Sequence, residues 1–140
     1  MKEVDYERGG MDVDDTQIGK TAAASTTVDE SNTARAVGSG SLDVFATPMM
    51  IALMERAACK ALSDVLESGQ TSVGTQIGVS HSAASPLGSS ITATATITSF
   101  GGRKIEFAVA ASDGVTEIGR GTHTRVIVDE AKFMTKAREK

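Results

Sequence analysis

Two ionisable side chains fall at positions where the surrounding pattern calls for apolar residues. On a helical wheel at 100° per residue, residues 47–68 form one apolar arc, and Glu55 lies inside it between Leu62 and Leu66. His81 ends an alternating stretch and lies on the side that carries Val and Ile. A carboxylate beside an imidazole sets the tautomer and basicity of the ring, as general acid–base catalysis requires. The structural alternatives are a carboxylate satisfied by amides or an arginine, and a hydrogen-bonded core histidine.

Thr47 and Gly74 are two further candidates. Thr47 precedes Pro48, so we expect it to be the N-cap of the helix, with proline at the first helical position. A helix N-terminus also presents amides and a positive dipole to a developing negative charge. Gly74 interrupts a strand pattern, which indicates either a bulge that bends the sheet or the close approach of a ligand to the backbone. Both interpretations stay open at each residue.

The element that carries Thr47 and Glu55 is predicted to be a helix over residues 47–68, ended by Gly69. Cys59 lies within its apolar arc, so we expect a buried small hydrophobe there. As the single cysteine of the chain, it excludes an internal disulfide.

Period-two alternation predicts four strands after this helix, over residues 72–81, 90–100, 104–111 and 115–128. A further edge strand is expected at residues 18–28, a hairpin turn at Gly101-Gly102, and a short terminal helix capped by Asp129 and carrying Phe133. One long helix with antiparallel strands predicts an α+β fold in which a curved sheet wraps the helix and a partner subunit covers sheet edges. Residues 16–140 would form this domain, behind a flexible segment over residues 1–15.

The charge and aromatic content of the chain limit the kinds of partner that it is expected to bind. The net charge is −4, and the chain has no Trp, one Tyr and four Phe, which argues against a nucleic-acid surface. The N-terminus lacks a signal-peptide pattern and no segment is apolar enough to span a membrane, so we expect a cytoplasmic protein. His81 and His123 are the only histidines and are far apart in sequence, so no metal site is expected.

Three segments together resemble the hotdog-fold thioesterases of the fluoroacetyl-CoA thioesterase type. They read DVFATPMMIALMERAA, TSVGTQIGVSHSAASPLG and GGRKIEFAVAASDGVTEIGRGTHTRVIV. The family's catalytic Thr, Glu and His are matched at the same intervals, and so is its substrate-contacting glycine. The matching residues are Thr47, Glu55, His81 and Gly74.

The resemblance implies a homodimer with active sites at the subunit boundary, acyl-CoA as substrate, and neither a metal nor an organic cofactor. Higher assemblies are left open. In that family's chemistry Glu55 would attack the thioester carbonyl or activate the water that does, and His81 would act as general acid and base. Thr47 would orient the carboxylate or the thioester, and the Gly74 amide would face the oxyanion.

Binding the phosphates of CoA requires cations. Arg103, Lys104 and Arg120 are candidates by charge alone. Together with Arg125 they are otherwise expected on solvated strand faces. Their role in CoA binding is therefore a prediction from charge alone.

The segment ahead of Thr47 departs from the fluoroacetyl-selective members of the family. Those members carry phenylalanines that cover the acyl pocket, and the corresponding positions here are Gly38 and Ser41. We therefore expect hydrolysis of short or medium acyl groups without fluoroacetyl selectivity. The alternatives are a non-enzymatic acyl-CoA sensor and a hotdog hydratase or dehydratase, although the Asp-x-Asn-Pro-x-His arrangement of hydratases is absent.

Overall fold

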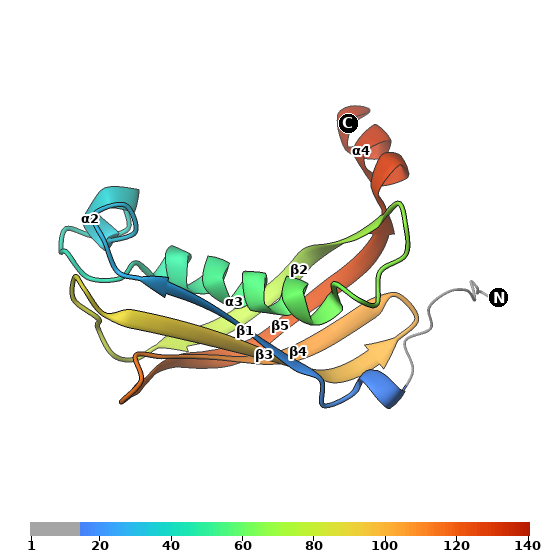
Figure 1. Cartoon of the computed structure of the whole chain (residues 1–140). Coiled ribbons are helices and arrows are strands. Elements are labelled where there is room, and N and C mark those ends of the chain that lie inside the picture. Colours follow the sequence, from blue (N-terminus) through green and yellow to red (C-terminus); the bar gives the residue numbers. More distant parts are fainter. Residues whose placement is uncertain (1–14) are drawn as a thin grey trace.

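A five-stranded antiparallel sheet curves around one central helix in the computed structural model, which describes residues 15–140 (Figure 1). The strands are β1 (Thr21–Thr27), β2 (Gln70–His81), β3 (Ser90–Gly101), β4 (Lys104–Ser112) and β5 (Glu117–Asp129). The helical elements are η1 (Asp15–Gln17), α2 (Ala34–Val37), α3 (Thr47–Leu62) and α4 (Glu130–Arg138). The predicted flexible segment lies outside the described residues, apart from Asp15, which begins η1.

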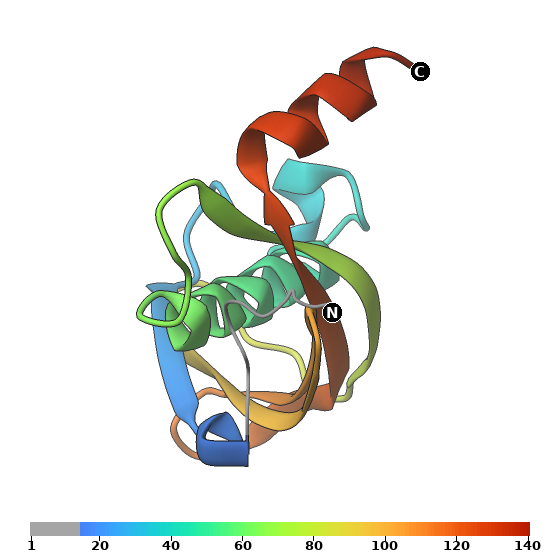
Figure 2. The same cartoon turned by 90° about the vertical axis from the view of Figure 1, so that its right-hand side faces the viewer.

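The sheet has the order β1-β3-β4-β5-β2, so β1 and β2 are its two edges. Figure 2 shows how the sheet wraps α3. The helix buries one side against the concave face through Met50, Leu53, Met54, Ala57, Ala58, Ala61 and Leu62. Opposite them lie the buried inward residues of β3 and β4, among them Ile91, Ile97, Ile105 and Phe107. Each large apolar side chain buried in this layer contributes about 1.5–3 kcal/mol of transfer free energy.

Helix α3 begins differently from the prediction. Ala46, not Thr47, is the N-cap, with extended backbone angles and a carbonyl that accepts hydrogen bonds from the amides of Met49 and Met50, each at 3.0 Å. The chain enters the helix through a hydrogen bond from the Ala46 amide to the Asn32 carbonyl at 3.0 Å. No side chain caps this end, which leaves the Thr47 hydroxyl available for another partner.

Helix α3 also ends earlier than predicted, at Leu62. The next residue, Ser63, donates its hydroxyl to the Lys60 carbonyl at 2.9 Å, and such local side-chain bonds compete with the helical ladder. Gly69, with φ of +84°, forms the turn that leads into β2 instead of ending the helix.

The buried side of α3 is narrower than the wheel indicates. Ala52 and Cys59 are exposed, and the Glu55 side chain is 40% exposed. These residues share one side of the helix, at i, i+3 and i+7. The prediction of a buried Cys59 is wrong for the single chain.

Strand β2 contains a bulge that changes its predicted alternation. Its pairing with β5 shifts between Gly74 and Gln76, so Thr75 is an extra residue. Gly74 pairs with Arg125, whose side chain is buried on the α3 side of the sheet. Beyond the shift, His81 faces the same side. The bulge therefore places Gly74 and His81 on one face, although strict alternation puts them on opposite faces.

The remaining elements follow the sequence prediction. The apolar sides of β3 and β4 are buried, and Gly102, with φ of +61°, lies in the hairpin turn between them. Asp129 caps α4 by accepting a hydrogen bond from the Lys132 amide at 3.1 Å. No helix within residues 15–140 is both long and apolar enough to cross a bilayer.

Candidate active site

The start of α3 and the end of β2 meet through a hydrogen bond of 2.7 Å between Thr47 Oγ1 and His81 Nδ1. The other ring nitrogen, Nε2, is buried and has no hydrogen-bond partner among the described residues. Burial lowers the pKa of His81, so the ring is neutral at neutral pH. A buried polar nitrogen without a partner is costly, so His81 Nε2 marks a position where a further group is needed.

A cavity of about 320 Å3 adjoins this pair. Its lining residues are Ala34, Ser39, Val44, Phe45, Thr47, His81, Ser82, Ala83 and Ala84. Phe45 is 2% exposed, and backbone bridges from Thr33 to Phe45 and from Val44 to Pro86 hold this wall in place. The combination of small apolar walls with one polar pair suits a small acyl group.

Glu55 belongs to a second cluster, with two residues of β5. Its Oε2 accepts a hydrogen bond from Arg125 Nη1 at 3.2 Å and lies 3.7 Å from His123 Nε2. Arg125 also donates from Nε to Ser72 Oγ at 2.8 Å and from Nη2 to the Ser72 carbonyl at 3.0 Å. These bonds hold the guanidinium in one orientation, so Arg125 gives the Glu55 carboxylate a fixed anchor.

The tautomer of His123 follows from its neighbours. Nδ1 lies 2.7 Å from the Gln76 carbonyl, which can only accept, so Nδ1 carries the proton. Nε2 then accepts from Arg125 Nη1 at 3.2 Å. Burial, reinforced by the positive charge of Arg125, lowers the pKa of His123, although the Gln76 carbonyl and Glu55 act in the opposite direction. The cluster thus consists of one cation, one carboxylate and a neutral ring.

Gly74 lies directly against this cluster. A Cβ at this position would be 2.5 Å from Glu55 Oε2, 3.0 Å from His123 Cε1 and 3.2 Å from Arg125 Nη1. The bulge interpretation of this glycine is confirmed, and its lack of a side chain also lets the Glu55 carboxylate approach the backbone of β2. A cavity of about 250 Å3 opens here, lined by Glu55, Gly74, Thr75, Gln76, Ile77 and His123.

The predicted residues therefore form two half-sites within one chain. Thr47 and His81 make one, and Glu55 and Gly74 the other. Glu55 follows Thr47 by eight positions along the helix, a rise of about 12 Å. The expectation that Glu55 and His81 face each other is wrong for a single chain, because Thr47 contacts the end of β2 whereas Glu55, further along α3, lies against Gly74 near the start of that strand.

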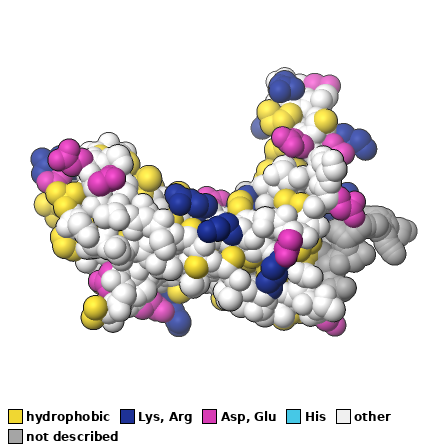
Figure 3. Space-filling view, in the orientation of Figure 1, with side chains coloured by type: hydrophobic (Ala, Val, Ile, Leu, Met, Phe, Trp, Pro, Cys, Tyr) yellow, Lys and Arg dark blue, Asp and Glu magenta, His cyan; other side chains and the backbone are white. Residues whose placement is uncertain are grey.

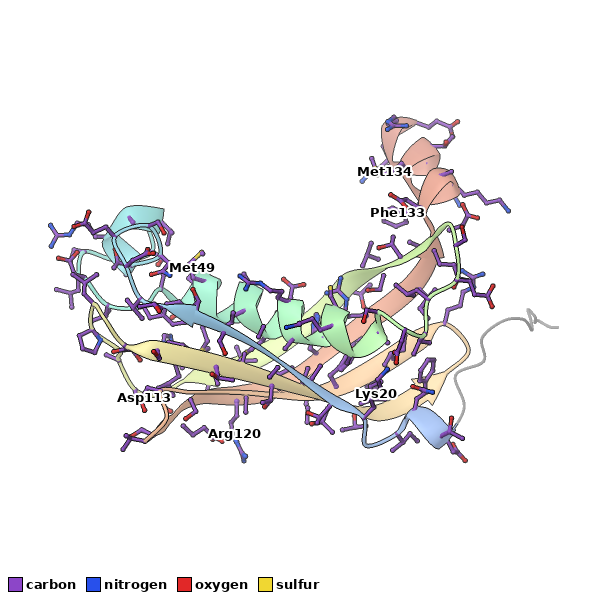
Figure 4. The ribbon with its side chains drawn as sticks, in the orientation of Figure 1. Lys20, Met49, Asp113, Arg120, Phe133 and Met134 are labelled. Carbon is purple, nitrogen blue, oxygen red and sulfur yellow. The ribbon has the colours of Figure 1, made fainter. Side chains whose placement is uncertain are left out.

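The cations suggested for CoA lie outside both cavities. Arg120 extends from the convex face of the sheet, opposite α3 (Figure 4). The polar contacts of the three cations include the Ile127 carbonyl at 3.2 Å from Arg103, Glu106 at 3.7 Å from Lys104, and Glu117 at 2.8 Å from Arg120. Their role in CoA binding stays a prediction.

His123 and Arg125 are the functional candidates that the sequence analysis missed. Arg125 was expected on a solvated face but is 6% exposed, and His123 is 2% exposed. The signal was present in the alternation of β5, where both residues share the side of the buried Ile127.

Comparison with known proteins shows the family to which this chain is similar. A model of the family described as fluoroacetyl-CoA-specific thioesterase matches residues 28–131. The fluoroacetyl-CoA thioesterase of Streptantibioticus cattleyicolor is 47% identical over 98 residues, which span 70% of each chain. This chain belongs to the fluoroacetyl-CoA-specific thioesterase family. The predicted class, an acyl-CoA thioester hydrolase, is confirmed with it.

Solved structures of this family and of more distant proteins share the fold. A structure of a fluoroacetyl-CoA thioesterase matches with a TM-score of 0.83 at 38% identity and covers 94% of this chain and 98% of its own. A hot-dog-like protein from Thermanaerovibrio acidaminovorans matches with a TM-score of 0.79 at 24% identity, covering 87% of this chain and 90% of its own, which shows the fold alone. The predicted hotdog architecture is thereby confirmed.

Proposed function

We propose that the chain hydrolyses small acyl-CoA thioesters at a composite site shared by two copies. The observation that supports this most is the position of the two half-sites. Gly74, against which Glu55 lies, and His81, which holds Thr47, occupy the same face near the two ends of one strand, β2. If two copies of that strand lie side by side, the Thr47–His81 half-site of one copy can lie beside the Glu55–Gly74 half-site of the other.

The free edge of β2 offers a symmetric way to join two copies. Edge strands present unpaired backbone groups that can pair with another chain. A two-fold axis at the midpoint between Ile77 and Gly78 pairs two copies of β2 antiparallel. Gly74 and His81 are equally distant from that midpoint, so Gly74 of one copy comes opposite the partner's His81. Glu55 and the Thr47–His81 pair would then face each other across the boundary.

The exposed side of α3 fits this arrangement. Ala52 and Cys59 flank Glu55 on the same side of the helix, and that side carries the residue that contacts β2. Small side chains let a neighbouring helix approach closely. A partner copy on this side would also remove Glu55 from solvent, which strengthens its electrostatic effect on a bound thioester.

The composite site contains the groups that thioester hydrolysis needs. Glu55 either bonds to the carbonyl carbon itself or removes a proton from the water whose oxygen does so. The carbonyl oxygen becomes an oxyanion that the Gly74 amide stabilises. The C–S bond then breaks as the oxyanion collapses. Where Glu55 has activated water, the proton it removed passes through the partner's His81 to the leaving sulfur of CoA. Where Glu55 itself has attacked, the partner's His81 takes a proton from the water that hydrolyses the acyl–Glu55 anhydride and passes it to that sulfur, which restores the carboxylate. Thr47 fixes the imidazole through its bond to Nδ1.

The cavity beside His81 sets the expected acyl size. Val44, Phe45 and Ala83 form apolar walls around about 320 Å3 of space. Phe45 is a wall of this cavity, but the two positions that correspond to the covering phenylalanines supply no aromatic ring, because Gly38 ends α2 with φ of +80° and Ser41 is exposed. We therefore expect short to medium acyl groups to be substrates and expect no preference for the fluoroacetyl group.

The test is hydrolysis across a panel of acyl-CoA esters that includes acetyl-CoA and fluoroacetyl-CoA. Glu55→Gln and His81→Ala should each lower kcat by about 10²–10⁴-fold, the range for general acid–base groups. Glu117→Gln, on an exposed carboxylate, is the matched control and should leave kcat unchanged. Retained hydrolysis in both site variants overturns the catalytic assignment. Tight CoA binding without hydrolysis by the native chain would instead indicate a sensor.

A further inference from the structure

Helix α4 contributes no residue to the site described above, and its side chains are exposed. None of its nine residues is buried, and Phe133 and Met134 are each 41% exposed. Figures 1 and 2 show it standing away from the sheet. A helix this short is marginal in water without tertiary packing, so its stability requires a covering surface.

The base of α4 is fixed beside the free edge of the sheet. Asp129, its N-cap, pairs with Gln70 at the start of β2. The Glu130 amide donates to the Gly69 carbonyl at 2.9 Å. The helix therefore starts at the end of β5, beside the first residue of the strand that the proposed dimer would share, and these bonds set its direction.

The same two-fold axis determines which segment of the second copy lies opposite the start of α4. Gln70 and Ser85 are equally distant from the midpoint between Ile77 and Gly78, so Gln70 lies level with the partner's segment 82–85. Ser82, Ala83 and Ala84 line the cavity beside Thr47 and His81. Given the composite site, α4 of one copy comes beside the Thr47–His81 cavity of the other.

Apolar side chains are exposed at that end of the molecule. Val37 is 40% exposed and Leu42 is 64% exposed, on the segment that lines the cavity through Ala34 and Ser39. Figure 4 shows Met49 near the start of α3 and Phe133 and Met134 on α4 at the opposite end of the molecule, all on the same side of the sheet. Figure 3 shows a depression between the α2 end and α4. A two-fold rotation brings these two ends together.

We propose that α4 docks on a second copy of this chain, where Phe133 and Met134 pack against Val37, Leu42 and Met49 and cover the entrance of the Thr47–His81 cavity. This rests on the proposed function. The contact removes apolar surface from water in both copies. It also gives each cavity a wall that its own chain lacks, so α4 contributes to excluding water from the bound thioester.

Photocrosslinking tests the contact directly. The full chain is prepared with benzoylphenylalanine at position 133, mixed with 15N-labelled unmodified chain, irradiated and digested with trypsin. We expect adducts on the peptide of residues 36–56, which contains Val37, Leu42 and Met49, and we expect that peptide to carry the label in mixed dimers. The same probe at Lys132, on the opposite side of α4, should give several-fold fewer of these adducts. Adducts within one chain, or none on this peptide, overturn the proposal.

Kinetics test the consequence for the cavity. Phe133→Ala combined with Met134→Ala should lower kcat/KM about tenfold or more, because apolar contact at the entrance is lost. Lys132→Ala is the matched control and should have no effect. An unchanged kcat/KM in the double variant overturns the role of α4. Failure of the composite site itself is detected separately, by mixing chains with different site variants, since that measurement leaves α4 intact.

Discussion

The Glu55 carboxylate lies against the backbone of Gly74, with no space between them for a methyl group. A Cβ at position 74 would be 2.5 Å from Glu55 Oε2, closer than real Cβ contacts allow. The bulge at Thr75 turns Gly74 toward α3 and leaves His81 on the same face of β2. The bulge in β2 therefore determines the position of Gly74 in one half of the proposed site and of His81 in the other.

Gly74→Ala should therefore displace Glu55 and lower kcat by about 10²-fold, a loss expected when a catalytic group is misplaced by about 1 Å. Gly101→Ala is the matched control, because a Cβ there meets nothing within 4 Å and Gly101 ends β3, which does not adjoin β2. Steady-state kinetics of both variants, with thermal unfolding to confirm folding, make the comparison. Equal activity in the two variants would show that the close approach of Glu55 is not required.

Arg125 is expected to affect hydrolysis by positioning the Glu55 carboxylate. Arg125→Met removes the hydrogen bond to the Glu55 carboxylate and leaves His123 Nε2 without its donor, so we expect kcat to fall by at least about tenfold. Arg125→Lys keeps the charge but not the planar set of donors and should recover part of the loss. In the Glu55→Gln background the same Arg125→Met change should cost much less. Additive effects in this double-mutant cycle would contradict a positioning role.

The two histidines report on the composite site by NMR. Glu55 lies 3.7 Å from His123 of its own chain and raises its pKa, so Glu55→Gln should lower that pKa. In the proposed dimer the partner's Glu55 also faces His81, so the pKa of His81 should fall in the same variant. Titration of the ring Cε1–H signals measures both, and assignment is simple because the chain has only these two histidines. A change confined to His123 would contradict the composite site.

Much of this arrangement could be predicted from sequence because it follows from local periodicity. The helix, the strands, the Asp129 cap and the alternation of β3 depend on neighbouring residues alone. The bulge at Thr75 could not be located, because a single glycine indicates a bulge or a close approach equally well. The capping of α3 by Ala46 depends on Asn32, which is distant in sequence.

The sequence allows candidate site residues to be named but does not show how they are arranged. Glu55 stood out as a charge within an apolar arc, yet its partner Arg125 lies 70 positions further along the chain. Cys59 was expected to be buried because the wheel cannot show that the sheet ends at β2. Sequence periodicity shows which residues of a helix or strand share a side. Whether that side is covered depends on how far the sheet extends, which periodicity does not show.

The most direct test of the composite site is complementation between two inactive chains. Glu55→Gln and His81→Ala chains, carrying different affinity tags, are co-expressed, and the mixed dimers are isolated. Each mixed dimer would hold one site with both groups native, so we expect about half of wild-type kcat per dimer. The control pairs a wild-type chain with a chain carrying both substitutions, where each site has one defective group and activity should be lost. Inactive Glu55→Gln/His81→Ala dimers together with half-active control dimers would contradict the composite site, because they would show that each chain's Glu55 works with its own His81.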